Sequence, residues 1–415
     1  MKDLNYTSST TIHKIFFAIA LSIFSTRTCL SEVVYVSNEG SDDQTRLDAF
    51  DRNQPFATIN FAISKALPGD DIVVLNGTYD GFEFGPSTLD AFDVEPGVFE
   101  NLDLSIRSEV KWGAIIERNV FIANVGNVEI SGFLFDGMPG FENNQLSVSD
   151  SANITIRDNR FDGNGADQII VGQSDGVLLE WNILGDVARG FQRGTPGFAS
   201  PAILVDLTSE KPINDQPFGV WIRNNTIYNS VSAIQVGRNL LAQINDDPSY
   251  GRPIMVENNL LLNIADTRAI SLEIDNIRAR YNTIVQFPGT DNNDFSPDSL
   301  IGVGVENRPV SQAYVYSNIL QTINGSRAAL GLTNVGSDVI AFNNLIDAPT
   351  LSTARNDEVR MMNWIADARL DGFIPRDDSP AIDNAFNPGD LFDLDVFGGS
   401  RQQGPAPDIG ALEVR

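Results

Sequence analysis

An asparagine recurs at one point of a repeated pattern through the middle of this chain. Each lies between a β-rich run and a second short run, as in VLLEWNIL around Asn182 and IMVENNLL around Asn259. Asparagine tolerates the left-handed backbone of a sharp turn better than most non-glycine residues. We therefore expect each to turn the chain and to stack in an internal ladder made of Asn159, Asn182, Asn225, Asn259, Asn282, Asn318 and Asn344.

The spacing of these asparagines predicts a solenoid. Successive intervals, starting from 159 to 182, are 23, 43, 34, 23, 36 and 26 residues. The shortest fits one turn of three short strands, and the longer ones fit a turn with a loop insertion. Unrelated hairpins in a β-sandwich would not place asparagine so regularly. A chain of 415 residues can remain one domain when it grows lengthwise in this way.

The charge of the chain limits its partners. The formal net charge is -27, and no basic face is evident that could neutralise phosphates. We therefore expect no binding to nucleic acid or to an anionic membrane. The acidity itself is explained most simply by solubility.

The start of the chain reads as a secretory signal over residues 1–31. Lys2 and Lys14 precede an apolar run over 15–24 that is too short to span a bilayer. No later stretch is long and apolar enough to do so. We expect a secreted protein, extracellular or periplasmic, with no membrane span.

The chain's single histidine and single cysteine, His13 and Cys29, both fall in the expected signal. The mature chain then has no disulfide and no histidine to act as base, acid or metal ligand. Zinc hydrolases, Ser-His-Asp triads and Cys-His pairs are excluded. We expect no nucleotide or organic cofactor.

Residues 32–110 are expected to form a strand, a capping helix and the first coils. Ile59, Ala62, Ile63 and Ala66 have helical spacing, and a Pro-Gly pair at 68–69 ends the helix. Such a helix would cover the open first coil of a solenoid.

Two segments carry a resemblance to a known group. YVSNEGSDD with PFATINFAISKALPGDDIVVLNGTYD, and later DSPAIDNA with DLDVFGGSRQQGPAPDIGALE, resemble the two ends of secreted bacterial right-handed parallel β-helix proteins of the pectin-lyase-like superfamily. The resemblance implies an all-β, right-handed parallel β-helix over 111–348 with a carboxy-terminal closing segment over 349–415. Its motifs are specific for fold and weak for activity, because the group includes lyases, hydrolases, epimerases and tailspikes.

The third strand of each coil is expected to stack in register with its neighbours. The aligned runs are QIIV (168–171), AILV (202–205), AIQV (233–236), AISL (269–272), LIGV (300–303) and ALGL (329–332). Alternation sends every second side chain outward. Loops of unequal length on both sides of this sheet would wall a groove, and a groove suits a polysaccharide.

Candidate site residues gather along this predicted sheet. Asp206 and Glu273 fall in one column two coils apart, about 9–10 Å at the spacing of strands. Gln235 points outward within its strand. Arg238 and Arg268 lie between or beside the two carboxylates.

The favoured hypothesis is cation-assisted β-elimination on a uronic-acid polysaccharide. The resemblance implies that arginine or lysine acts as base, and Arg238, Arg268 and Lys211 are the candidates. Asp206, Glu273 and Asp275 could hold Ca²⁺ through hard oxygen ligands. Arg189, Arg193 and Arg223, with Arg238 and Arg268, could form a basic patch that offsets the acidic field. Gln235, Arg189, Arg193 and Arg223 are the candidates for binding the substrate.

Two alternatives stay open. Asp206 and Glu273 could act as the acid and base of an inverting glycoside hydrolase, which needs carboxyl groups about 6.5–9.5 Å apart. The surface could also bind glycans without catalysis, since charged residues alone are weak evidence of a catalytic site. In each case we expect a monomer.

Overall fold

The computed structural model describes most of the chain after the expected signal, which lies outside the described residues. The described ranges are 31–85, 100–137, 144–162, 167–185, 201–206, 219–237, 252–264, 268–287, 299–304, 310–323, 328–333, 335–336, 338–348, 350–352, 360–389, 393–401 and 403–414.

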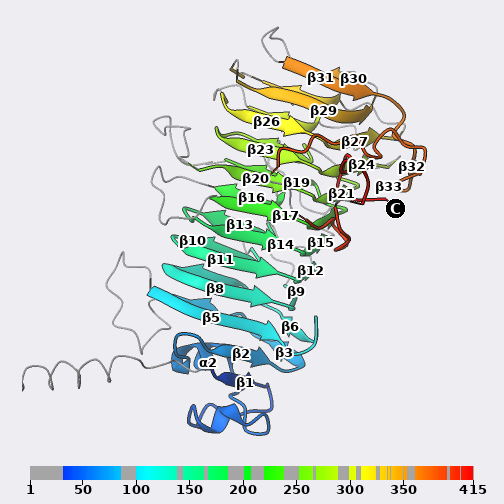
Figure 1. Cartoon of the computed structure of the whole chain (residues 1–415). Coiled ribbons are helices and arrows are strands. Elements are labelled where there is room, and N and C mark those ends of the chain that lie inside the picture. The colour runs from blue at the N-terminus through cyan, green and yellow to red at the C-terminus, as the bar shows by residue number, and fades with distance from the viewer. Residues whose placement is uncertain are drawn as a thin grey trace, which may run out of the picture.

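The fold is a right-handed parallel β-helix, as predicted, with one coil stacked on the next (Figure 1). The first strands of successive coils pair in parallel along its length. They are β1 (Val33–Val36), β2 (Asp71–Val74), β5 (Glu100–Ser108), β8 (Val125–Ser131), β11 (Ala152–Arg157), β14 (Val177–Glu180), β17 (Val220–Arg223), β20 (Ile254–Glu257), β23 (Ile277–Arg280), β26 (Ala313–Tyr316), β29 (Ile340–Asp347) and β31 (Arg360–Ile365).

The second strands form a shorter row that joins the first in one 21-stranded sheet among the described residues. They are β3 (Gly77–Tyr79), β6 (Ala114–Ile116), β9 (Leu134–Asp136), β12 (Arg160–Asp162), β15 (Ile183–Gly185), β18 (Thr226–Tyr228), β21 (Leu260–Leu262), β24 (Thr283–Gln286) and β27 (Ile319–Thr322). The last of them pairs with the second half of β29.

The third strands form a separate parallel sheet, ten-stranded in the described part of the chain. They are β4 (Glu83–Phe84), β7 (Val120–Ala123), β10 (Leu146–Ser149), β13 (Ile169–Gly172), β16 (Pro201–Asp206), β19 (Ser232–Val236), β22 (Ile270–Leu272), β25 (Ser299–Val303), β28 (Ala328–Leu332) and β30 (Thr350–Ser352). The predicted stacking is confirmed residue by residue, since Ile169, Ile203, Ile234, Ile270, Ile301 and Leu330 pair in sequence.

The asparagine ladder is present, but its physical basis differs from the prediction. Asn182 Oδ1 accepts from the backbone N–H of Asn159 at 3.1 Å and from its Nδ2 at 3.3 Å, and Asn182 Nδ2 donates to Asn225 Oδ1 at 3.1 Å. The same contacts run up the stack and continue to Asn363. The ladder asparagines thus bond one coil to the next inside the turn.

The left-handed conformation belongs to the residue before each ladder asparagine. The positive φ angles fall at Asp158, Trp181, Asn224, Asn258, Tyr281, Ser317 and Asn343. The prediction that the ladder asparagines themselves adopt it is therefore wrong. Asparagine is needed because its amide both donates and accepts, which lets one side chain satisfy buried groups on two coils.

The predicted amino-terminal helix is present as α2 (Ile59–Lys65), where Thr58 Oγ1 caps the amide of Phe61 at 3.2 Å. It buries Ile59, Ala62 and Ile63 and lies beside β1 and β2 at one end of the stack (Figure 1). A 3₁₀ turn, η1 (Asp48–Phe50), precedes it. No helix among the described residues is long and apolar enough to cross a membrane.

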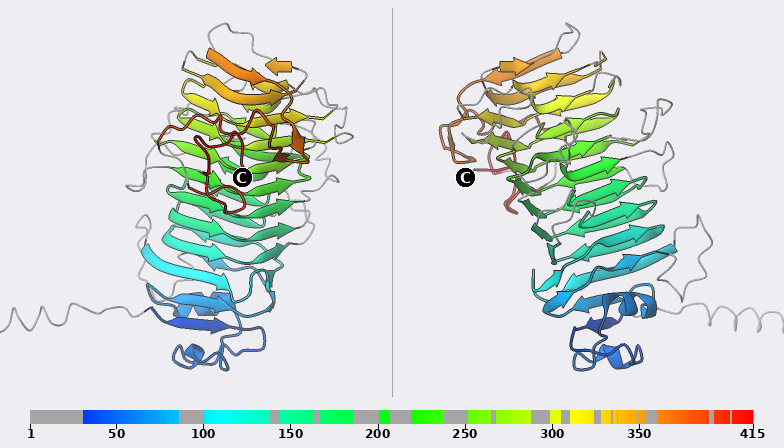
Figure 2. Two further views of the ribbon diagram at one scale, coloured as in Figure 1. Left: turned by 45° about the vertical axis from the view of Figure 1, so that its right-hand side comes forward. Right: turned by 180° about the vertical axis from the view of Figure 1, so that it is seen from behind.

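The carboxy-terminal segment lies along the side of the stack. After β31 the chain forms a short antiparallel pair, β32 (Leu370–Asp371) with β33 (Ile374–Pro375), and then runs back past earlier coils (Figure 2). Ala411 N–H donates to Thr283 Oγ1 at 2.9 Å, and the fully buried Arg401 donates to Asn258 Oδ1 at 2.5 Å. The described residues of this segment (366–389, 393–401 and 403–414) therefore contact the ladder turns of the middle coils.

Candidate functional site

The outward face of the ten-stranded sheet carries one side chain per coil in register. Burial alternates along β10 and β13, where Ile169 and Val171 are buried and Ile170 is half-buried, whereas every residue of β19, β22, β25 and β28 is buried. The outward residues that pair from coil to coil form a straight row, here called the outward column. Its members are Phe121, Ser147, Ile170, Leu204, Gln235, Ser271, Gly302 and Gly331.

Polar side chains meet in the middle of this face, in what we call the central cluster: Gln235, Arg268, Ser271 and Glu273. Glu273 Oε1 accepts from Gln235 Nε2 at 3.0 Å and from Ser271 Oγ at 2.9 Å. Arg268 Nη1 lies 3.4 Å from the same Ser271 Oγ. The cluster therefore links a cation and a carboxylate through one hydroxyl.

Local sequence explains how this cluster forms. Strand β22 is short, so Arg268 and Glu273 lie just outside its two ends while Ser271 faces outward between them. Arg268 leans over the next coil, where a Cβ on Gly302 would lie 2.1 Å from its Cδ. Its Nη1 also donates to the carbonyl of Gly304 at 2.9 Å. Glycine at 302 thus leaves room for the arginine on the floor of the face.

Glu273 leans in the opposite direction. It contacts the preceding coil, where a Cβ on Gly237 would lie 3.3 Å from its Cβ. Gly237 has a φ of +97°, which a residue with a side chain would rarely adopt. The carboxylate is only 8% exposed and receives two hydrogen bonds from neutral donors.

The predicted column of Asp206 and Glu273 agrees with the register of the strands. Gly237 N–H donates to Val205 O at 2.8 Å, and Glu273 N–H donates to Val236 O at 3.0 Å. These bonds place the backbones of Asp206 and Glu273 two strands apart, about 9–10 Å along the sheet.

Arg223 lies away from this face. It is on β17 of the 21-stranded sheet, where its Nε and Nη2 each contact Glu180 Oε2 at 2.8 Å. Its guanidinium also stacks on the ring of Trp221, 4.3 Å from the centroid. The structure therefore gives Arg223 an ion pair on another sheet and does not bring it to the central cluster.

One of the three expected calcium ligands is already engaged. Asp275 is held by the next coil, since its two oxygens accept from the N–H and hydroxyl of Ser311 at 2.7 and 2.8 Å. No group of three aspartates or glutamates that could hold a metal ion occurs in the part of the chain that the structure describes. We derive no step through calcium.

Four predicted residues cannot be placed. Arg189, Arg193, Lys211 and Arg238 fall outside the described residues. Arg238 directly follows Gly237, and Lys211 belongs to the segment after β16, so both are joined in sequence to strands of the ten-stranded sheet.

Sequence reasoning missed two residues on the face. Ser271 links the central cluster, and Phe121 is the large aromatic side chain of the outward column, 45% exposed. The alternation in NVFIA around Phe121 matches that of the later third strands and could have placed it.

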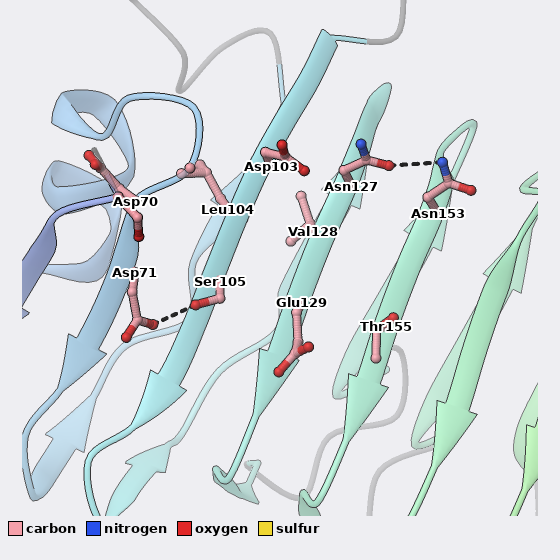
Figure 3. A pocket seen from close by; sticks show the side chains of 12 residues that line it. Asp70, Asp71, Asp103, Leu104, Ser105, Asn127, Val128, Glu129, Asn153 and Thr155 are labelled. Carbon is pink, nitrogen blue, oxygen red and sulfur yellow. Dashed lines mark hydrogen bonds between the residues drawn. The ribbon is translucent and has the colours of Figure 1, made fainter. Parts of the chain in front are cut away.

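A concavity of about 330 Å³ lies on the other sheet, near the amino-terminal end of the stack (Figure 3). Asp71, Ser105, Glu129 and Thr155 line it from β2, β5, β8 and β11. Three of its four carboxylates form ion pairs: Asp70 with Arg46 at 2.6 Å, Asp71 with Arg107 at 2.9 Å and Glu129 with Arg157 at 2.7 Å. These ion pairs account for most of the acidic lining without a ligand.

Two carboxyl groups of the carboxy-terminal segment have raised pKa values. Burial raises the pKa of the Glu413 carboxyl to about 7, and burial also raises the pKa of Asp408. Glu413 Oε2 accepts from the backbone N–H of Asp408 at 3.0 Å and lies 3.8 Å from Arg401. Glu413 therefore binds other residues of the carboxy-terminal segment and is far in sequence from the central cluster.

No protein-family model matches the chain, and no curated protein sequence matches it. Among solved structures, the chain is similar to PfbA, a surface adhesin of Streptococcus pneumoniae, with 13% identity over 77% of this chain and 80% of that one, at a TM-score of 0.47.

It is also similar to pectate lyase Pel9A, with 13% identity over 93% of this chain and 97% of that one, at a TM-score of 0.49. For alginate lyase AlyF-OU02 in complex with G6, the identity is 15% over 82% of this chain and 65% of that one, at a TM-score of 0.48. Identities this low align no site residues.

Proposed function

We propose that this chain is a secreted carbohydrate-active protein that binds a uronic-acid polysaccharide along the ten-stranded sheet and cleaves it by β-elimination. The face is straight and regular, and ten strands span about 43 Å at the spacing of a sheet. A surface of this length suits several units of a polymer better than a small molecule.

The observation that carries the proposal is the placement of Arg268. Its guanidinium lies across Gly302 on the outward face and is oriented by Gly304 O and Ser271 Oγ. Gln235 and Ser271 beside it are oriented in turn by Glu273. A preorganised guanidinium next to hydroxyl and amide groups is suited to binding a sugar carboxylate and its hydroxyls.

The chemistry follows from this charge. A base removes the proton on the carbon next to the uronate carboxylate, and the electrons of that C–H bond form a carbon–carbon double bond. The glycosidic C–O bond breaks, and the leaving oxygen takes a proton. Arg268 would stabilise the negative charge that develops on the carboxylate. The base is assigned to Arg238 or Lys211.

The test is a screen of the signal-free chain against polygalacturonate, alginate and chondroitin sulfate, following ultraviolet absorbance and reducing ends together. Elimination produces both signals. We expect Arg268→Ala to lower kcat/KM by about 100-fold, the usual effect of removing one preorganised donor. Arg268→Lys should retain part of the activity, because it keeps the charge and loses the planar fork.

The matched control is Arg369→Ala, which removes a half-exposed arginine from the carboxy-terminal segment, where it pairs with Asp378 at 3.1 Å. It should leave the rate unchanged. Absence of unsaturated product on every polymer, or full activity in a folded Arg268→Ala variant, would refute elimination at this site.

Hydrolysis is the second candidate, favoured by one observation. Asp206 and Glu273 lie two strands apart on this face, and inverting hydrolases hold their carboxyl groups about 6.5–9.5 Å apart. New reducing ends without ultraviolet absorbance, abolished by Glu273→Gln, would establish it. Retention on a polysaccharide column without product would indicate a binding solenoid.

A further inference from the structure

The outward column changes character along the solenoid. Towards the amino-terminal end it presents Phe121, Ser147, Ile170 and Leu204, of which only Ser147 is polar, and from the middle onward it presents Gln235, Ser271 and glycine. Phe121 is 45% exposed, while Val120 and Ile122 on either side are buried. The exposed ring therefore contributes little to the core, which its two neighbours fill.

The distance from this aromatic ring to the central cluster is set by the strands. Strands β7, β10, β13, β16 and β19 pair in succession, so Phe121 lies four strand spacings, about 19 Å, from Gln235. A sugar ring in an extended polymer advances by roughly one strand spacing. A polymer that follows the column would thus place its fourth or fifth unit from the cluster over Phe121.

Chemistry favours a sugar ring as the occupant. One face of a pyranose presents C–H groups, which carry partial positive charge, and the face of a phenyl ring is negative. Ile170 and Leu204 form an apolar floor next to the cluster, Ser147 separates them from the ring with a hydroxyl, and none of the three adds charge. One coil beyond Phe121 the column reaches Glu83 on β4, whose carboxylate would repel a uronate and so marks the end of the apolar floor.

We propose that Phe121, with Ile170 and Leu204, forms a distal binding platform for the sugar rings of the polysaccharide bound at the central cluster. The proposal rests on the proposed function for the identity of the polymer. It adds that affinity depends on length: oligosaccharides that reach Phe121 bind more tightly than those that occupy the central cluster alone. Phe121 is thus a residue that selects long substrates.

The experiment measures binding separately from turnover. Isothermal titration with oligogalacturonates and oligoguluronates, from dimers to octamers, is performed on wild type, Phe121→Ala and Phe121→Trp. We expect Phe121→Ala to raise Kd about tenfold for oligomers longer than about five units, and to leave dimers and trimers unchanged, because only the longer ones span the distance. Phe121→Trp should retain the length dependence.

The matched control is Phe397→Ala, which removes another exposed phenylalanine, 61% exposed, from the carboxy-terminal segment. It should not change the affinity for any oligomer. The platform would be overturned if wild type and Phe121→Ala bound long oligomers with equal affinity, or if neither bound them. It would also be overturned if Phe121→Ala weakened the binding of dimers as much as that of long oligomers. Length-dependent binding without unsaturated product would instead overturn only the proposed elimination.

Discussion

Glycine substitutions at two adjacent residues separate the two explanations of the asparagine ladder. Asp158 has a φ of 57°, and Asn159 is the ladder residue that follows it. If asparagine were needed for a left-handed turn, Asn159→Gly would be tolerated, because glycine adopts that conformation most easily. The structure predicts the opposite, since the Asn159 side chain bonds two coils and Asp158 carries the turn.

The magnitude follows from the bonds that each side chain makes. Asn159 Oδ1 accepts from Phe133 N–H at 2.9 Å, and its Nδ2 donates to Ile130 O at 3.0 Å, all fully buried. Losing these bonds and adding a flexible glycine should cost about 3–5 kcal/mol. Asp158→Gly loses partly exposed pairs with Lys111 at 2.8 Å and Arg157 at 3.1 Å and relieves the left-handed strain, so its net effect should stay within about 1 kcal/mol.

The assay is urea unfolding followed by tryptophan fluorescence and by far-ultraviolet circular dichroism. The four tryptophans of the chain report the tertiary structure, and the dichroism reports the coils. A loss of less than about 1 kcal/mol for Asn159→Gly would refute the bonding role of the ladder, because a buried unsatisfied N–H alone costs about that much or more. A larger loss at Asp158 than at Asn159 would refute it as well.

Two other predictions concern buried charges. Because the pKa of Glu413 is raised from 4.5 to about 7, the folded chain holds a proton that the unfolded chain releases, so stability falls as the pH rises through this window, by on the order of 3 kcal/mol. Glu413→Gln should remove this pH dependence. The difference between the unfolding free energies of the variant and wild type should therefore change between pH 4.5 and 7. A difference that stays constant over this range would contradict the raised pKa. Arg280 and Glu257 form a buried pair at 2.5 Å, so Arg280→Met should cost about 3–5 kcal/mol by stranding the carboxylate, while Glu257→Leu with Arg280→Met should recover most of it. If urea unfolding shows that the losses of the two single variants add up in the double variant, the two charges do not stabilise each other and the prediction is wrong.

The fold could be predicted because its signals are local and repeated. The asparagine interval and the alternation of QIIV, AILV and AIQV were sufficient to align the third strands as the structure pairs them. The same alternation, read further towards the amino terminus, would have placed Phe121. The left-handed residue was assigned one position too late, because the sequence pattern does not distinguish a turn residue from the side chain that bonds across it.

The site could be predicted only in part. Arg268, Gln235 and Glu273 are on one face, as expected from their positions around the third strands. Arg223 pairs with Glu180, which is 43 residues earlier, and Asp275 binds Ser311, which is 36 residues later. Such partners lie one coil away, and insertions of unequal length between coils hide their proximity in the sequence.

The sequence by itself determined that this chain winds into parallel coils, which face of each third strand is buried, and which residues stack in register. A short repeat specifies these features, because every coil meets the same kind of neighbour. The tertiary structure alone decided which polar groups remain on the outward face of the ten-stranded sheet and which are paired elsewhere. It also decided that the described residues after Ile365 return along the ladder turns, where Arg401 reaches Asn258 across 143 residues. Contacts of that range depend on how whole coils pack, and no local pattern encodes them.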